Sequence, residues 1–65
     1  MSLYDYHKSS EISSEDPPFA ALIMAAIRKA DSNNLTKLRV SFPAIFEEFW
    51  ERYDNPGGYL NKERK

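Results

Sequence analysis

The pattern of apolar positions predicts one strongly apolar helix in the first half of the chain, at residues 17 to 30. Its apolar side chains recur at the three-and-four spacing of a single helical face: Phe19, Leu22, Ile23, Ala26, Ile27 and Ala30. The opposite flank is apolar too, because it carries Met24 and three alanines. A helix that is apolar nearly all round is expected to be covered on nearly all sides.

The sequence Asp16-Pro17-Pro18 marks the start of this helix. A residue before proline is held in extended geometry, and an N-cap residue needs that geometry. Asp16 is therefore predicted to cap the helix, with Pro17 in its first helical position. Arg28 and Lys29 follow at the other end, where they complement the negative end of the helix dipole.

Two shorter helices are predicted after the turn-forming residues 31–34. The first ends at about residue 41, because Pro43 cannot continue it. The second has Pro43 in its first turn and is ended by residues 55–58, Asn-Pro-Gly-Gly. The apolar stripes of the two helices are Leu35, Leu38 and Phe42, and then Ile45, Phe46, Phe49 and Tyr53.

These elements predict an all-α fold, a small three-helix bundle at residues 16–58. Residues 1–15 are polar and rich in serine, so they are expected to form a flexible arm with at most one short helical turn. Residues 59–65 are expected to form a charged tail. The sequence contains no internal repeat or heptad pattern that would favour another architecture.

The length of 65 residues allows a single domain with a marginal core. A chain of this size buries only about 60% of the surface that its unfolded form exposes, so small domains usually need a disulfide, a metal or a partner. The chain has no cysteine, which excludes disulfides and thiolate zinc sites. We therefore expect support from another chain, as a homodimer, a larger homo-oligomer or a complex with another protein.

The aromatic side chains indicate where such a surface lies. The chain has nine of them, which is many for its length. Phe46 and Phe49 are expected in the core, but Trp50 and Tyr53 cannot both follow them inward on one helix. Because Trp and Tyr dominate interface hot spots, Trp50 and Tyr53, with Met24, form the predicted interaction surface.

Nucleic acid is the alternative partner. The nine basic and ten acidic residues give a net charge of −1, which argues against strong phosphate binding. A modest basic patch is predicted from four residues near the first turn: Arg28, Lys29, Lys37 and Arg39. Three glutamates on the third helix, Glu47, Glu48 and Glu51, would repel phosphates.

The sequence contains few residues that could carry out catalysis. His7 is the only histidine, and it lies in the predicted arm, where nothing fixes its orientation. A metal site would need further ligands beside it, so we expect no catalytic residue, metal or cofactor. The chain is predicted not to be an enzyme.

The segment from Phe19 to Ile27 is the longest apolar run, and it is far shorter than the roughly 20 residues of a membrane span. The N-terminus carries acids, tyrosines and serines and lacks the basic start of a signal peptide. We therefore expect a cytoplasmic protein without membrane association.

Several short motifs follow one another between residues 9 and 60. They are Asp16-Pro17-Pro18-Phe19, Ala21-Leu22-Ile23-Met24-Ala25-Ala26, Arg28-Lys29-Ala30-Asp31, Lys37-Leu38-Arg39, Phe42-Pro43, Arg52-Tyr53 and Pro56-Gly57-Gly58. In this combination the chain resembles a group of small proteins encoded by bacteriophages and prophages. The resemblance implies a phage context and the cytoplasm of the host cell, but no activity, ligand or site residue. Small phage proteins of this kind often bind a host enzyme or an assembly partner, so a host protein joins the expected partners.

Overall fold

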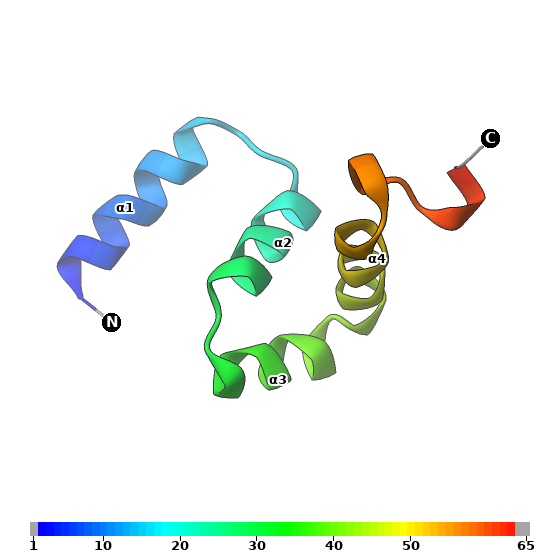
Figure 1. Ribbon diagram of the computed structural model, residues 1–65. Helices are drawn as coiled ribbons and strands as arrows, with labels where there is room; N and C mark the ends of the chain where they lie inside the picture. Colours follow the sequence, from blue (N-terminus) through cyan, green and yellow to red (C-terminus); the bar gives the residue numbers. More distant parts are fainter. Residues whose placement is uncertain (1, 64–65) are drawn as a thin grey trace.

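The computed structural model describes residues 2–63, and these residues contain helices and no strand (Figure 1). The all-α class is thus confirmed. The elements in order are α1 (Leu3–Ser14), α2 (Phe19–Lys29), α3 (Ser32–Ser41), α4 (Pro43–Asp54) and two short 3-10 helices, η1 (Pro56–Gly58) and η2 (Asn61–Glu63). The three-helix bundle is not confirmed, because the structure has a fourth α-helix. None of the described helices combines the length and the apolar character that crossing a membrane requires.

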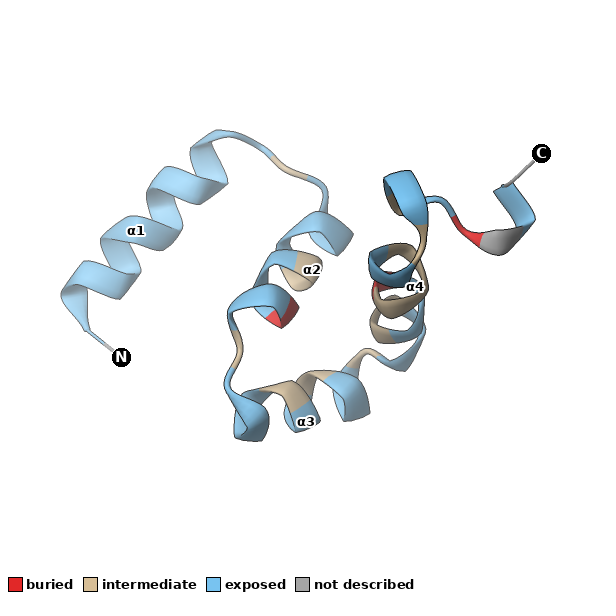
Figure 2. Ribbon diagram, in the orientation of Figure 1, coloured by how far each residue is buried: buried red, intermediate tan, exposed pale blue. Residues whose placement is uncertain are grey.

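Helix α1 occupies the segment for which the sequence predicts an arm with at most one short helical turn. Its N-terminus carries a capping box: the Ser2 hydroxyl accepts from the Asp5 amide, and the Asp5 carboxylate accepts from the Ser2 amide, each at 3.1 Å. Every residue from 2 to 16 is exposed, and α1 stands apart from the other helices (Figure 2). The prediction missed α1 because it relied on composition and on the spacing of apolar residues, and neither of these detects a capping box.

Helix α2 begins two residues later than predicted, and Asp16 does not cap it. Asp16 has a left-handed φ of 52°, while Pro18 is the N-cap residue with φ −59° and ψ 147° and makes no side-chain cap hydrogen bond. The physical reason is that Pro17 itself precedes a proline. The same restriction that was assigned to Asp16 excludes Pro17 from helical geometry, so the helix starts at Phe19.

Helices α3 and α4 follow the prediction closely. Helix α3 ends before Pro43, which occupies the first turn of α4. At the start of α3, the Asp31 side chain accepts from the Asn34 amide at 2.8 Å and caps the helix. Beyond α4, both Gly57 and Gly58 have positive φ, 69° and 72°, which is the left-handed geometry expected of this helix stop.

The core of the described residues is small and centres on α4, which packs against α2, α3 and η1. Its buried side chains are Ile27, Phe49 and Leu60, at 4%, 4% and 6% exposure. Helix α2 contributes Ile27 and the half-buried Ile23 and Met24, whereas Phe19 at its start is 61% exposed. The cover predicted on nearly all sides of this helix is therefore not supplied by the folded chain.

The segment after α4, predicted as a tail, is attached to the fold up to Glu63. Arg52 donates to the carbonyl of Gly58 at 2.9 Å and to both carboxylate oxygens of Glu63, at 2.9 and 3.1 Å. Between these two contacts, Leu60 is buried. The last two residues of the predicted tail, 64 and 65, and the first residue of the predicted arm lie outside the described residues.

The folded chain is extended and exposes much of its surface. Its radius of gyration is 13.7 Å, against about 11 Å expected for a compact domain of this length. Its accessible surface is 5539 Å², against roughly 4,300 Å² for a folded monomer of this mass. The excess is about 1,200 Å², and α1, which has no buried residue, and the largely exposed α2 contribute to it.

Candidate interaction surface

The aromatic side chains of α4 form a continuous cluster. Phe49 lies at its centre, with its ring centroid 5.4 Å from that of Trp50 and 5.7 Å from that of Tyr53. Phe46 extends the cluster at 6.0 Å from Trp50. Three of the pairs, including Trp50 with Tyr53, meet edge to face, while Phe49 and Tyr53 are stacked; both are favourable arrangements of two rings. Spacing of three or four residues on one helix brings together all these pairs except Phe49 and Trp50, which are neighbours in sequence.

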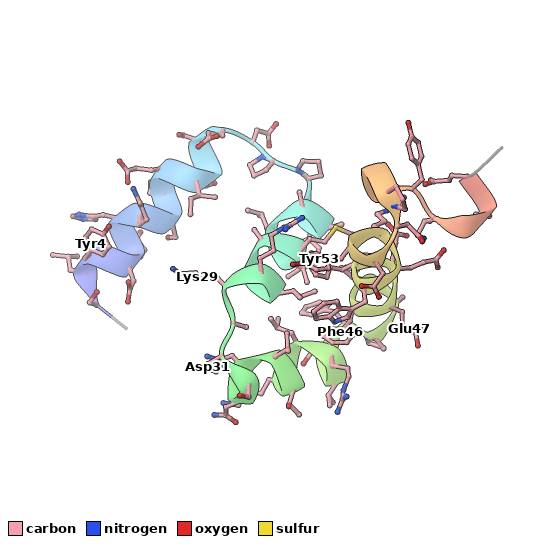
Figure 3. All side chains as sticks on the ribbon, viewed as in Figure 1. Tyr4, Lys29, Asp31, Phe46, Glu47 and Tyr53 are labelled. Atoms are coloured by element: carbon pink, nitrogen blue, oxygen red, sulfur yellow. The ribbon has the colours of Figure 1, made fainter. Side chains whose placement is uncertain are left out.

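Arg28 lies over this cluster from α2. Its guanidinium carbon is 5.2 Å from the ring centroid of Phe49 and 5.8 Å from that of Tyr53, within the range of a cation–π interaction. Figure 3 shows Tyr53 extending from α4 toward α2. Arg28 thus helps to join α2 to α4, a role that its position in the predicted basic patch did not indicate.

The three residues of the predicted interaction surface lie around Arg28 but differ in exposure. Tyr53 is 60% exposed, whereas Trp50 and Met24 are half-buried. A hollow of about 190 Å³ is lined by Met24 and Tyr53, and another of about 290 Å³ by Trp50 and Tyr53; Arg28 and Phe49 line both. Tyr53 is therefore the accessible part of this surface, and its neighbours support it from the sides.

The four residues of the predicted basic patch are divided in the structure. Lys29 and Lys37 line one hollow of about 490 Å³, whereas Arg28 lies over the aromatic rings and Arg39 does not line this hollow. The Lys29 side chain points away from α4 (Figure 3). A single patch of four cations is thus not formed.

The hollow at Lys29 and Lys37 lies between α2 and α3 and has an apolar floor, and we call it the α2–α3 groove. It is lined by Ala26, Lys29, Ala30, Asp31, Asn34, Lys37, Leu38, Ser41 and Phe42. Phe19 continues its apolar character along α2, because its ring meets that of Phe42 edge to face at 5.8 Å. The periodicity of apolar positions predicts the helical faces but does not indicate that this face stays open.

A second electrostatic feature lies on the other side of α4. Hydrogen bonds from the Leu60 amide, at 2.9 Å, and from Arg52 lower the pKa of Glu63 below its ordinary value. In return, hydrogen bonds to Glu63 and Glu48 raise the pKa of Arg52. Arg52 and Glu48 are four residues apart on α4 and pair at 3.2 Å, whereas spacing along the chain gives no sign of the contact with Glu63. This arrangement fastens the C-terminal segment to α4.

His7 and the acidic side chains are the remaining candidates for chemistry. His7 lies on exposed α1, with its ring 6.1 Å from that of Tyr6. No group of three or more histidine, aspartate or glutamate side chains within residues 2–63 is placed to hold a metal ion. Neither a family model, nor a curated protein, nor a solved structure matches the chain. The phage context stays a prediction.

Proposed function

We propose that this chain is a small protein–protein interaction module that self-associates. The observation that carries the proposal is the excess of about 1,200 Å² of exposed surface over that expected for a monomer of this mass. A stable dimer buries about 800 Å² on each partner, so the excess is large enough to supply such an interface. In the phage context that the sequence implies, the assembled module would act on a host protein.

The composition of the exposed surface supports the same proposal. The most exposed large apolar side chains lie on all four α-helices and include Leu3, Tyr6, Phe19, Val40 and Tyr53. A chain with so small a core gains most from covering such side chains with another chain. Self-association covers those on α1 and α2, and Tyr53, supported by Phe49 and Arg28, is the anchor offered to a second protein.

Sedimentation velocity of the full chain over a wide range of concentration tests the proposal. We expect a shift from monomer to dimer as concentration rises, and a far-UV spectrum that stays helical throughout. A sedimentation coefficient that stays monomeric at every concentration would refute self-association. The proposal would then be reduced to binding of a host protein, and capture of such a protein should be lost in a Tyr53→Ser variant.

The alternative of nucleic-acid binding is favoured by the two lysines of the α2–α3 groove alone. Arg28 is engaged with Phe49 and Tyr53, and the groove also carries the anionic Asp31. Two cations neutralise too few phosphates for tight binding at physiological salt. A mobility-shift experiment at low salt with double- and single-stranded DNA separates the alternatives, and no shift is expected.

A further inference from the structure

We propose that self-association occurs by exchange of α1: the α1 helix of one chain binds in the α2–α3 groove of a second copy, and the second copy returns its own α1. This inference rests on the proposed self-association and names the surfaces that meet. Exchange of an identical element between two copies forms a closed dimer with two equal interfaces.

The first observation is that α1 is a helix without a buried residue. It has 12 residues, a length at which an isolated helix is only marginally stable in water. Its apolar side chains Leu3, Tyr4 and Tyr6 are all about 70% exposed. The capping box fixes the start of this helix before binding, and packing against another chain would stabilise the rest of it.

The second observation is the shape of the receiving surface. The α2–α3 groove holds about 490 Å³ over a floor of Ala26, Ala30, Leu38 and Phe42. Small alanines let another helix backbone approach closely, and Phe19 extends the apolar strip beyond the groove. The hollows beside Tyr53 are smaller, about 190 and 290 Å³, and Arg28 lines them both. The groove is therefore the better seat for a helix.

The third observation is complementary charge. Residues 2–16 contain four acidic residues and one basic residue, a net charge of −3. Residues 17–42 contain four basic residues and one acidic residue, a net charge of +3. Lys29 and Lys37 place two of these cations at the groove, while Glu11 and Glu15 lie on the exposed C-terminal half of α1 and beside it. Opposite fields of this kind steer two surfaces together and fix their register.

The fourth observation is the linker, which favours a second copy over the same chain. Asp16 is held in left-handed geometry, and it is followed by Pro17 and Pro18, with Pro18 extended. Two successive prolines form a short, stiff spacer, and the structure holds α1 away from its own α2 (Figure 1). Short, strained hinges are the connections that favour exchange between chains.

The test exploits the reciprocal geometry with two full-length variants. The groove variant carries Lys29→Glu and Lys37→Glu, and the helix variant carries Glu11→Lys and Glu15→Lys. Each alone brings like charges together in both interfaces, so we expect its dimer dissociation constant to rise at least about tenfold. In an equimolar mixture each interface of the mixed dimer again joins opposite charges, so a mixed dimer within about threefold of wild-type affinity is expected.

A control variant with Glu47→Lys and Asp54→Lys changes the net charge by as much as the helix variant does, but on α4, and it should leave the affinity unchanged. Wild-type affinity in both the groove and helix variants would overturn the exchange while leaving self-association standing. Monomers in the mixture would also overturn it, because α1 folded back on its own chain cannot be rescued by another chain. A wild-type chain that is always monomeric would refute both proposals.

A linker variant tests the exchange of α1 independently. Pro17→Gly with Pro18→Gly removes the stiff spacer without touching α1 or the groove. Since the flexible linker lets α1 reach its own groove, the dimer dissociation constant should rise about tenfold, with unchanged helical content. An unchanged dissociation constant would overturn the role of the linker in directing α1 to a second chain.

Discussion

Replacement of Phe49 by leucine tests whether the aromatic cluster holds the fold together. Phe49 is one of the three buried side chains among the described residues. Its ring contacts those of Trp50 and Tyr53 and lies under the guanidinium of Arg28. Leucine keeps an apolar side chain at this position but loses the ring contacts.

The expected loss follows from these contacts. Leucine has three fewer side-chain carbons than phenylalanine, which at about 0.8 kcal/mol for each buried carbon gives about 2 kcal/mol. Losing the ring pairs adds about 1 kcal/mol. A domain of 65 residues has a free energy of unfolding of roughly 3–10 kcal/mol, so the Phe49→Leu protein should remain folded but strongly destabilised. Alanine would cost more and risks complete unfolding.

Urea unfolding at one fixed protein concentration measures the loss, because Trp50 is the only tryptophan and touches Phe49. The midpoint should fall while the dependence of the unfolding free energy on urea stays unchanged. Val40→Ala is the matched control, since Val40 is 74% exposed and should change stability by less than about 0.5 kcal/mol. A Phe49→Leu protein as stable as the Val40→Ala control would refute the assignment of this cluster to the core.

Three further predictions concern the start of α3 and the segment after α4. Asp31→Ala removes the N-cap of α3 and should lower the free energy of unfolding by about 1 kcal/mol, measured in urea, with Asn34→Ala as a milder control. Gly57→Ala forces a Cβ into left-handed geometry 3.1 Å from the Tyr59 ring, so it should lower the thermal midpoint, whereas an unchanged midpoint would contradict the geometry of this turn. The lowered pKa of Glu63 means that its carboxylate favours the folded state above the ordinary pKa of 4.5, and that this contribution is lost as pH falls through the lowered pKa. Glu63→Gln should therefore flatten the decline of the thermal midpoint in acid, and an identical decline in both proteins would show that Glu63 does not cause it.

The sequence predicted what depends on local rules and apolar period. The end of α3, the start of α4 at Pro43 and the glycine stop after α4 all lie where proline and glycine chemistry places them. The start of α2 was missed because one restriction was applied to Asp16 and not to Pro17. Such rules act between residues that are neighbours in sequence. They therefore predict where a helix begins and ends better than they predict which of its residues are buried.

The candidate site shows the limit of pattern alone. Periodicity grouped Phe19 with Ile27 on one face, but the structure buries Ile27 and leaves Phe19 largely exposed. Which side of α2 is covered depends on where α4 crosses it, and spacing along the chain does not contain that information. Arg28 was grouped with the basic residues for the same reason, because the two rings that it contacts belong to another helix.

The central place of α4 has a consequence for how the protein is made. The buried side chains Ile27, Phe49 and Leu60 come from widely separated parts of the chain, and α4, near the C-terminus, joins them. During synthesis, α2 emerges long before α4 exists, so its apolar face has no partner within its own chain. Folding of the core must wait until Leu60 has been added. A message truncated only a few codons before Leu60 would therefore yield a chain with exposed apolar helices, which is a substrate for cellular proteases.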